Sequence, residues 1–199
     1  MGTVLTHRFT EAADYAREAH THQVRKGTNV PYLAHLLGVA SLVLDHGGDE
    51  DQAIAGLLHD VVEDQGTHHI DIVRSKFGER VARIVEACTD GTMEQKAHAQ
   101  TPEEKRMDWD RRKKSYLEHL DRAQDDVLLV SGADKLHNAR AILRDLQDPK
   151  IGESVFQRFT GGKDGTLWFY RSIAELMARH GQPMARELQA VTTAMDQES

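Results

Sequence analysis

The stretch Leu57-Leu58-His59-Asp60-Val61-Val62-Glu63-Asp64 decides how the rest of the chain is interpreted. Four ionisable side chains occur within these eight residues, inside a longer apolar run. A helix turns by about 100° per residue, so all four ionisable side chains fall within one arc and aliphatic residues occupy the rest. The pattern predicts an amphipathic helix with an acidic face. Residues elsewhere in the chain decide whether that face is only solvated or serves a chemical site.

Two further polar residues interrupt apolar helical runs in the same way. His35 lies within residues 31–40, and Asp134 lies within residues 127–138. A lone histidine on an apolar face is more often a core residue, and a lone aspartate in a helix is usually solvated. A buried carboxylate, however, is costly unless it is paired or bound to a metal. The ordered set of a His, an adjacent His-Asp and a distant Asp therefore favours one metal site, with candidate ligands His35, His59, Asp60 and Asp134.

This ligand set contains nitrogen and oxygen donors and no thiolate. Such donors suit Mn, Fe, Zn, Ni or Co, with little to choose among them from ligand type alone. Four protein ligands leave positions for water and for a substrate oxygen. A metal held in this way would lower the pKa of the bound water and polarise the group to which the substrate oxygen belongs.

At this point the sequence resembles the HD-domain metal-dependent phosphohydrolases, and among them the hydrolase domain of the RelA/SpoT homologues. Residues 25–35, with Arg-Lys-Gly, Pro-Tyr and a His, resemble the first motif of that group. Residues 59–64 resemble its hydrolytic motif and residues 134–138 its closing one, so the match spans about residues 8–146. The resemblance implies an all-α, compact multi-helix HD-domain fold and the activity of a small alarmone hydrolase. Such an enzyme removes the 3′-pyrophosphate from (p)ppGpp or (p)ppApp with one Mn²⁺.

The same resemblance implies roles for individual residues. It assigns Glu63 and Asp64 to the positioning and deprotonation of the attacking water. Arg25 and Lys26 would contact phosphate and base, and Asn138 would reach the nucleotide. Further candidates for substrate contacts are Arg140, Lys135 and Arg112.

Two departures from the pattern leave the substrate open. Many relatives carry a Thr three residues after the Asn, where this chain has Ala141, and residues 90–116 match the long bifunctional members poorly. Guanosine and adenosine alarmones therefore both remain candidates. The alternatives are another HD-type nucleotide phosphatase, such as one acting on NADPH, and a metal-dependent nucleotide sensor without turnover. A structural helical protein with a fortuitous His-Asp pattern is the third alternative.

Length and composition indicate the number of domains, the kind of partner and the location of the protein. Its 199 residues suit a single HD hydrolase domain over residues 1–199, with a core at about 8–146 and C-terminal helices at about 166–198. The net charge of −7 makes it a poor general binder of DNA or RNA. Cys88 is the only cysteine, which fits a reducing cytoplasm, and no apolar run approaches the ~20 residues that span a bilayer. We expect a cytoplasmic protein whose partner is a small nucleotide, and a homodimer remains open.

Helical periodicity recurs along the chain and strand signals are nearly absent. Most histidines, such as His20, lie in polar stretches and are expected to be solvated. The basic residues of the segment 102–123 are interpreted first as a solvated face, and alternatively as an overhang that meets phosphate. Loops are expected at residues 89–100 and at the glycines 161, 162 and 165. The expected helices cover residues 9–24, 31–45, 49–66, 70–77, 79–88, 101–123 and 126–146, with two more beginning at 166 and 183.

Overall fold

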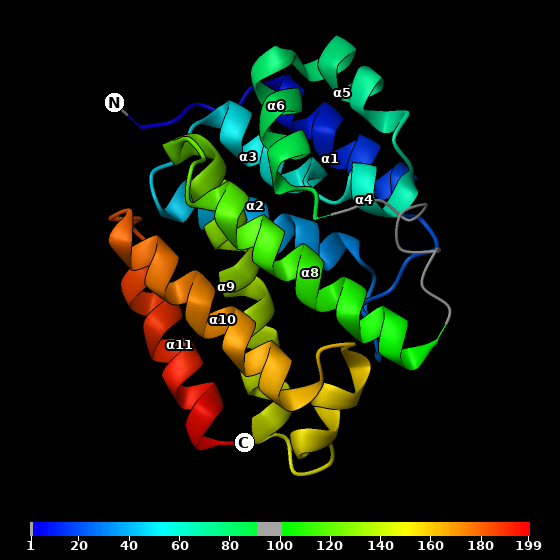
Figure 1. Cartoon of the computed structure of the whole chain (residues 1–199). Helices are drawn as coiled ribbons and strands as arrows, with labels where there is room; N and C mark the ends of the chain where they lie inside the picture. Colours follow the sequence, from blue (N-terminus) through cyan, green and yellow to red (C-terminus); the bar gives the residue numbers. More distant parts are fainter. Residues whose placement is uncertain (1, 91–100) are drawn as a thin grey trace.

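A computed structural model describes residues 2–90 and 101–199 of the chain (Figure 1). Within those residues the regular structure is helical, apart from one isolated bridge between Val24 and Pro31. The predicted all-α fold is therefore confirmed. The elements are α1 (His7–Ala19), α2 (Leu33–Asp45), α3 (Glu50–Leu58), α4 (Val61–Gln65), α5 (His69–Phe77), α6 (Glu79–Cys88), α8 (Pro102–Leu120), α9 (Asp125–Gln147), the 3-10 helix η1 (Gly152–Arg158), α10 (Gly162–Arg179) and α11 (Ala185–Gln197).

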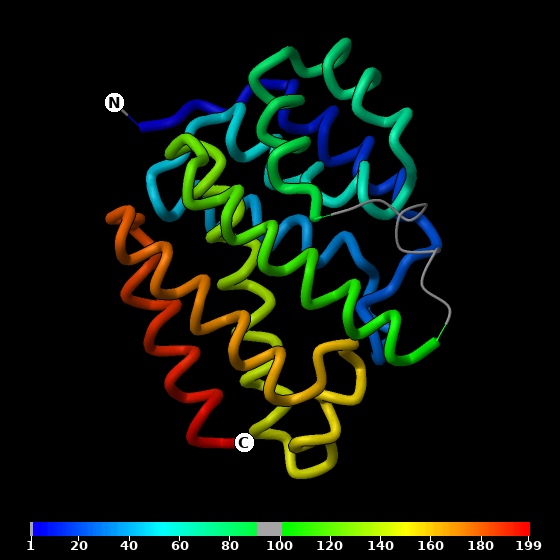
Figure 2. Tube along the Cα trace, viewed as in Figure 1, coloured from blue at the N-terminus to red at the C-terminus, as the bar shows by residue number. Residues whose placement is uncertain are grey.

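Helix α9 is the centre of the fold. It packs against α2, α3 and α6 on one side and against α10, α11 and η1 on the other. An apolar helix that is buried nearly all round belongs in a core, and α9 buries an unbroken run from Val127 to Asp134. The tube in Figure 2 shows α10 and α11 side by side beyond α9, away from the N-terminal helices. Any polar residue on the buried part of α9 therefore faces the middle of the molecule.

Helices α2 and α3 approach closely because of one glycine. A Cβ built at Gly56 of α3 would lie 3.3 Å from the Cα of Ala40 in α2. Such a distance is tighter than ordinary van der Waals contact, so a larger residue would push the helices apart. The close approach brings the C-terminal end of α3 next to the polar residues of α2.

The first helix is shorter than predicted. It ends at Ala19 instead of Val24, and the Thr21 hydroxyl lies 2.9 Å from the carbonyl oxygen of Arg17 and 2.8 Å from that of Glu18. The Glu18 carbonyl already accepts from the backbone N–H of Thr21, so the hydroxyl can serve the Arg17 carbonyl at the end of the helix. Residues 20–32 instead form a loop, closed by the Val24–Pro31 bridge.

The expected glycine-rich loop is also wrong, because Gly162 and Gly165 lie within α10. Gly165 serves packing, because a Cβ there would come 3.1 Å from the Trp109 ring of α8. Helix α8 itself begins as predicted, with a capping box formed by Thr101 and Glu104. The loop expected at residues 89–100 lies, beyond Asp90, outside the described residues.

None of the helices in the described part of the chain combines the length and the apolar character that a bilayer crossing requires.

Candidate active site

The His59-Asp60 pair lies in a turn between two helices. Helix α3 ends at Leu58 and α4 begins at Val61, so the predicted continuous helix over residues 49–66 is wrong. The backbone of Asp60, with φ −98° and ψ −3°, lies in the sparsely populated bridge region that often occurs at active sites. The break changes the direction of the chain at the pair itself. Glu63 and Asp64 consequently project from a separate short helix.

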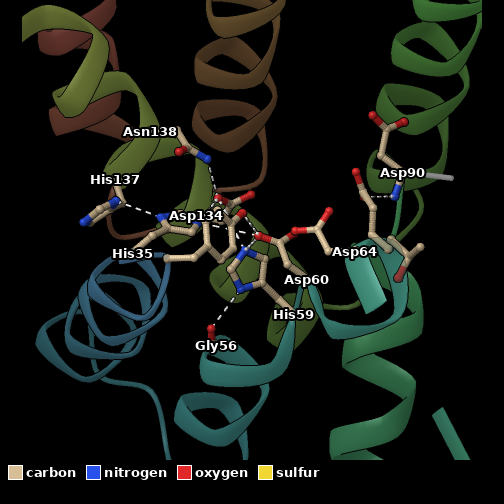
Figure 3. A network of polar contacts seen from close by, with 12 residues as sticks. His35, Gly56, His59, Asp60, Asp64, Asp90, Asp134, His137 and Asn138 are labelled. Atoms are coloured by element: carbon tan, nitrogen blue, oxygen red, sulfur yellow. Dashed lines mark hydrogen bonds and ion pairs between the residues drawn. The ribbon is translucent and has the colours of Figure 1, made fainter. Parts of the chain in front are cut away.

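Four side chains from three places in the fold converge at this turn (Figure 3). One ligand atom each from His35 in α2, His59 and Asp134 in α9 lies within 4.8 Å of the others. Asp60 joins them, with its Oδ2 3.0 Å from His59 Nε2 and 3.7 Å from His35 Nε2. Asp134 Oδ1 lies 3.2 Å from His35 Nε2 and 3.5 Å from His59 Nε2. The predicted ligands therefore surround one point, which we call the four-residue cluster.

Two nitrogens of the cluster are suited to bind a cation. The Nε2 atoms of His35 and His59 are buried and have no hydrogen-bond partner within the described part of the chain. Nδ1 of His59 donates to the carbonyl oxygen of Gly56 at 2.8 Å, which directs its Nε2 lone pair into the cluster. Nδ1 of His35 lies 2.9 Å from Nδ1 of His137. Burial lowers the pKa of His137 to about 4, so a neutral His137 can accept this bond and orient His35.

The carboxylates give the cluster its negative charge. Burial raises the pKa of Asp134, but Lys135 and the imidazoles outweigh burial and hold that pKa well below its usual range. Burial also raises the pKa of Asp60, but the neighbouring His59 outweighs burial and holds that pKa well below its usual range. Burial alone would lower the pKa of His59, yet the two carboxylates raise it, so a cation on its Nε2 is favoured. A divalent metal would compete there with a proton.

Further side chains hold the carboxylates in place. The Tyr32 hydroxyl donates to Asp60 Oδ2 at 2.5 Å, and burial raises the pKa of Tyr32, which keeps it a donor. Asn138 Nδ2 donates to Asp134 Oδ1 at 2.6 Å, while the Lys135 ammonium binds the other oxygen of Asp134. Such partners orient metal ligands and tune their basicity.

The two predicted hydrolytic residues lie beside the cluster. Figure 3 shows Asp64 next to Asp60, on the side toward Asp90. Gln23 Nε2 donates to Asp64 Oδ2 at 2.7 Å, and the backbone N–H of Asp90 donates to Glu63 Oε2 at 3.1 Å. Both carboxylates are therefore held by residues outside α4.

A cavity of about 370 Å³ opens next to His35. Its volume is within the range of small-molecule sites. Three of the predicted substrate residues line it, namely Arg25, Lys26 and Asn138. Arg25 Nη1 donates to Asn138 Oδ1 at 2.9 Å, and Asn138 in turn bonds Asp134. A continuous chain of hydrogen bonds thus joins the cavity wall to the four-residue cluster.

The other three predicted substrate residues lie elsewhere, because acidic neighbours hold them. Lys135 is partly buried and pairs with Asp134 beside the four-residue cluster. Arg140 pairs with Glu187 of α11 on the surface. Arg112 bonds Asp108 and Asp90 and lines a separate hollow of about 350 Å³ beside α6 and α8.

The cavity also has walls that the sequence reading missed. Arg158 of η1 and the aromatic residues Phe159 and Tyr170 line it. The Arg158 guanidinium bonds Asp145 at 2.5 Å and packs over Gly27, where a Cβ would lie 2.4 Å from Arg158 Nε. Gly27, with φ +76°, was the one local signal, but it does not indicate which residue covers it.

His20 was expected to be solvated, and this prediction is wrong. Its side chain is only 4% exposed, and its ring stacks on Tyr32 with centroids 5.3 Å apart. The polar sequence around it gave no indication of this burial, which results from the loop folding back over the end of α1.

Comparisons with known proteins show the family of the chain. The HD-domain family matches residues 12–166. A Xenopus tropicalis protein named guanosine-3′,5′-bis(diphosphate) 3′-pyrophosphohydrolase MESH1 is 38% identical over 137 residues, 67% of this chain and 69% of that protein. The human protein of the same name is 36% identical over 140 residues, 69% of this chain and 70% of that protein.

A solved structure is similar over nearly the whole chain. It is that of a metazoan ortholog of SpoT, described as hydrolysing ppGpp, and it superposes with a TM-score of 0.69. The match covers 99% of this chain and 96% of that one at 24% identity, and it shows a shared fold. Together with the match over residues 12–166, these findings show that the chain belongs to the HD-domain family.

Proposed function

We propose that the protein is a metal-dependent hydrolase that removes the 3′-pyrophosphate from guanosine or adenosine alarmones, (p)ppGpp or (p)ppApp. One observation carries the proposal: two buried imidazole nitrogens without partners face two carboxylates, beside a cavity lined by Arg25 and Lys26. The relatives named as 3′-pyrophosphohydrolases support the same reaction.

The four-residue cluster fits a divalent metal, for which we propose Mn²⁺. Imidazole nitrogen and carboxylate oxygen are ligands that such ions accept. A metal bound by His35, His59, Asp60 and Asp134 would supply a Lewis acid that polarises a phosphate group. The surrounding hydrogen bonds to Gly56, His137, Tyr32 and Asn138 keep the ligands oriented toward one point.

Other side chains activate the water and bind the substrate. Glu63 and Asp64 orient the attacking water and accept its proton, because they follow the His59-Asp60 pair in α4 and are not among the proposed metal ligands. Arg25 and Lys26 supply positive charge to the rest of the substrate. Asn138 ties Arg25 to Asp134, so binding in the cavity and the position of the reacting phosphate are linked.

We further infer that residues 1–199 form one HD hydrolase domain, because α9 packs against helices from both halves of the chain. A cytoplasmic location fits the single buried cysteine, and the net charge of −7 argues against nucleic-acid partners. A homodimer stays an open prediction.

The test is a substrate panel of ppGpp, ppApp, NADPH, GTP, ATP and dGTP with Mn²⁺, with products separated by ion exchange. We expect pyrophosphate from the alarmones and little product from GTP or ATP, which lack a 3′-pyrophosphate. Orthophosphate from NADPH alone, or rapid dGTP cleavage without action on alarmones, would contradict the proposal. Tight alarmone binding without product would indicate a sensor.

A further inference from the structure

The side chain of Gln23 joins the loop of residues 20–32 to the hydrolytic carboxylate of Asp64. Gln23 Nε2 donates to Asp64 Oδ2 at 2.7 Å. Gln23 Oε1 lies 2.7 Å from Gln65 Nε2 and 2.7 Å from His20 Nδ1. A single amide thus connects α4 with the loop that follows α1.

The orientation of this amide is fixed by its partners. The Asp64 carboxylate can only accept, so the atom of Gln23 that faces it must be the NH₂ nitrogen, and the acceptor oxygen of Gln23 then faces Gln65 Nε2. His20 meets the same oxygen and must therefore carry its proton on Nδ1. A flipped amide would place its NH₂ group against two donors and its oxygen against a carboxylate. The Gln23 NH₂ group is consequently committed to Asp64.

His20 supports this arrangement from inside the protein. Its ring is 4% exposed and stacks on Tyr32, whose hydroxyl donates to Asp60. Burial lowers the pKa of His20, so the ring stays neutral with one proton to donate. A buried, stacked ring cannot move away from Gln23 without leaving an unpaired polar group.

The backbone of Gln23 also anchors the loop that reaches the cavity. Its carbonyl oxygen accepts from Tyr32 N at 2.9 Å, and Arg25 N donates to Val30 O at 2.8 Å. These two bonds close the base of the segment that presents Arg25 and Lys26 to the cavity. Gln23 itself does not line that cavity, although Arg25 is only two residues away.

We propose that Gln23 is a positioning residue that holds Asp64 in its reactive orientation, supported by His20 and Gln65. The inference rests on the proposed hydrolase function. It differs from a purely structural role for the loop, because the effect of Gln23 on the reaction passes through one carboxylate. Loss of the amide should therefore lower kcat and leave the binding of metal and substrate largely intact.

The experiment compares wild type with Gln23→Leu, which keeps much of the side-chain volume and removes both polar atoms. We expect kcat to fall about tenfold to hundredfold, the scale of a misplaced catalytic group, with KM and bound Mn²⁺ little changed. His22→Leu is the matched control, since His22 is exposed in the same turn and should keep wild-type kinetics. A wild-type kcat in Gln23→Leu would overturn the proposal.

A double-mutant cycle separates positioning from folding. In an Asp64→Ala background the carboxylate that Gln23 orients is gone, so adding Gln23→Leu should cause little further loss of kcat. A full additional loss would show that Gln23 acts elsewhere, and would overturn the proposal. If Gln23→Leu fails to fold, the comparison of His20→Asn with His20→Leu replaces it, because Asn can still donate from the position of Nδ1. If only His20→Asn retains activity, the hydrogen bond from His20 to Gln23 supports the position of Asp64. Equal activity of His20→Asn and His20→Leu would contradict the proposal.

A crystal structure of Gln23→Leu gives a readout that does not depend on turnover. We expect the Asp64 side chain to leave its wild-type rotamer while the four-residue cluster stays in place. An unmoved Asp64 would overturn the inference even if the wild-type protein cleaved no alarmone. An inactive wild type combined with a displaced Asp64 would instead count against the proposed function alone.

Discussion

The imidazole of His137 occupies the space that a side chain at Gly38 would need. A Cβ built at Gly38 would come 2.2 Å from His137 Nε2. The other nitrogen of the same ring, Nδ1, lies 2.9 Å from Nδ1 of His35. The missing side chain in α2 is therefore what lets a residue of α9 orient a metal-ligand candidate of α2.

We predict that Gly38→Ala weakens metal binding about tenfold to hundredfold, the usual cost of losing a residue that orients a metal ligand. The methyl group displaces His137, and His35 loses its hydrogen bond. Isothermal titration calorimetry with Mn²⁺ measures the change in metal affinity. Leu37→Ala is the control, because that neighbouring side chain is 45% exposed. Unchanged affinity in Gly38→Ala would mean that His137 does not orient His35.

We predict that His59→Ala and Asp60→Ala lose both bound metal and turnover while they remain folded. These side chains serve the cluster and fill no part of the apolar core, so their loss opens no large apolar cavity. Metal analysis after purification without chelator tests the loss of bound metal. Thermal unfolding followed by circular dichroism tests whether the variants remain folded. A variant with full metal occupancy and full rate would remove that residue from the ligand set.

We predict that Glu63→Gln keeps the metal and lowers kcat by about two orders of magnitude, the usual contribution of a general base. The substitution is nearly isosteric, and its amide oxygen can still accept from the Asp90 N–H. Steady-state kinetics with metal analysis on the same sample test the prediction. Wild-type turnover would make Glu63 an ordinary surface acid.

Local sequence patterns were enough to place the candidate ligands. Polar residues that interrupt apolar helical runs identified His35, the His59-Asp60 pair and Asp134, because helix periodicity and the cost of burying charge act on short segments. The same reasoning found the start of α8 at Thr101, since a capping box is a local signal. What these predictions share is that each depends on neighbours within a few residues.

Features that depend on distant contacts could not be predicted in this way. The break after Leu58 is invisible to periodicity, because the apolar pattern continues across it. The burial of His20 requires the loop to bring Tyr32 back onto its ring, and the position of Arg158 requires η1 to meet Gly27. The basic side chain of Arg112 was considered for phosphate but is held by Asp108 and Asp90. Asp108 lies one turn earlier in α8 and is a local partner, whereas the contact with Asp90 joins residues 22 apart in the sequence.

The ion pair between Asp126 and Arg83 gives a prediction about pH. Burial raises the pKa of Asp126, but Arg83 and Arg80 outweigh burial and lower it below the ordinary value of 3.8. Because the folded pKa is the lower one, the stabilisation is fully present above pH 3.8 and is lost as the pH falls through the folded pKa. Asp126→Asn should therefore lower the free energy of unfolding by about 1 kcal/mol at neutral pH.

This difference from wild type should vanish in acid, where Asp126 is protonated in both states. Urea unfolding at neutral pH and at a pH well below 3.8 measures both values. Asp125→Asn is the control for the helix N-terminus, because Asp125 is exposed in the same first turn of α9. A loss of stability in Asp126→Asn that is independent of pH would contradict the prediction.

We predict that Arg25→Ala raises KM for the alarmone more than it lowers kcat. Arg25 lines the cavity, and its proposed contact is with parts of the substrate remote from the attacked phosphorus, so its loss removes binding common to ground and transition states. A smaller loss of kcat is also expected, because Arg25 is bonded to Asn138 and through it to Asp134. Arg140→Ala is the matched control, an arginine of α9 that is paired with Glu187 away from the cavity. Equal KM values for wild type and Arg25→Ala with both ppGpp and ppApp would place Arg25 outside the substrate site.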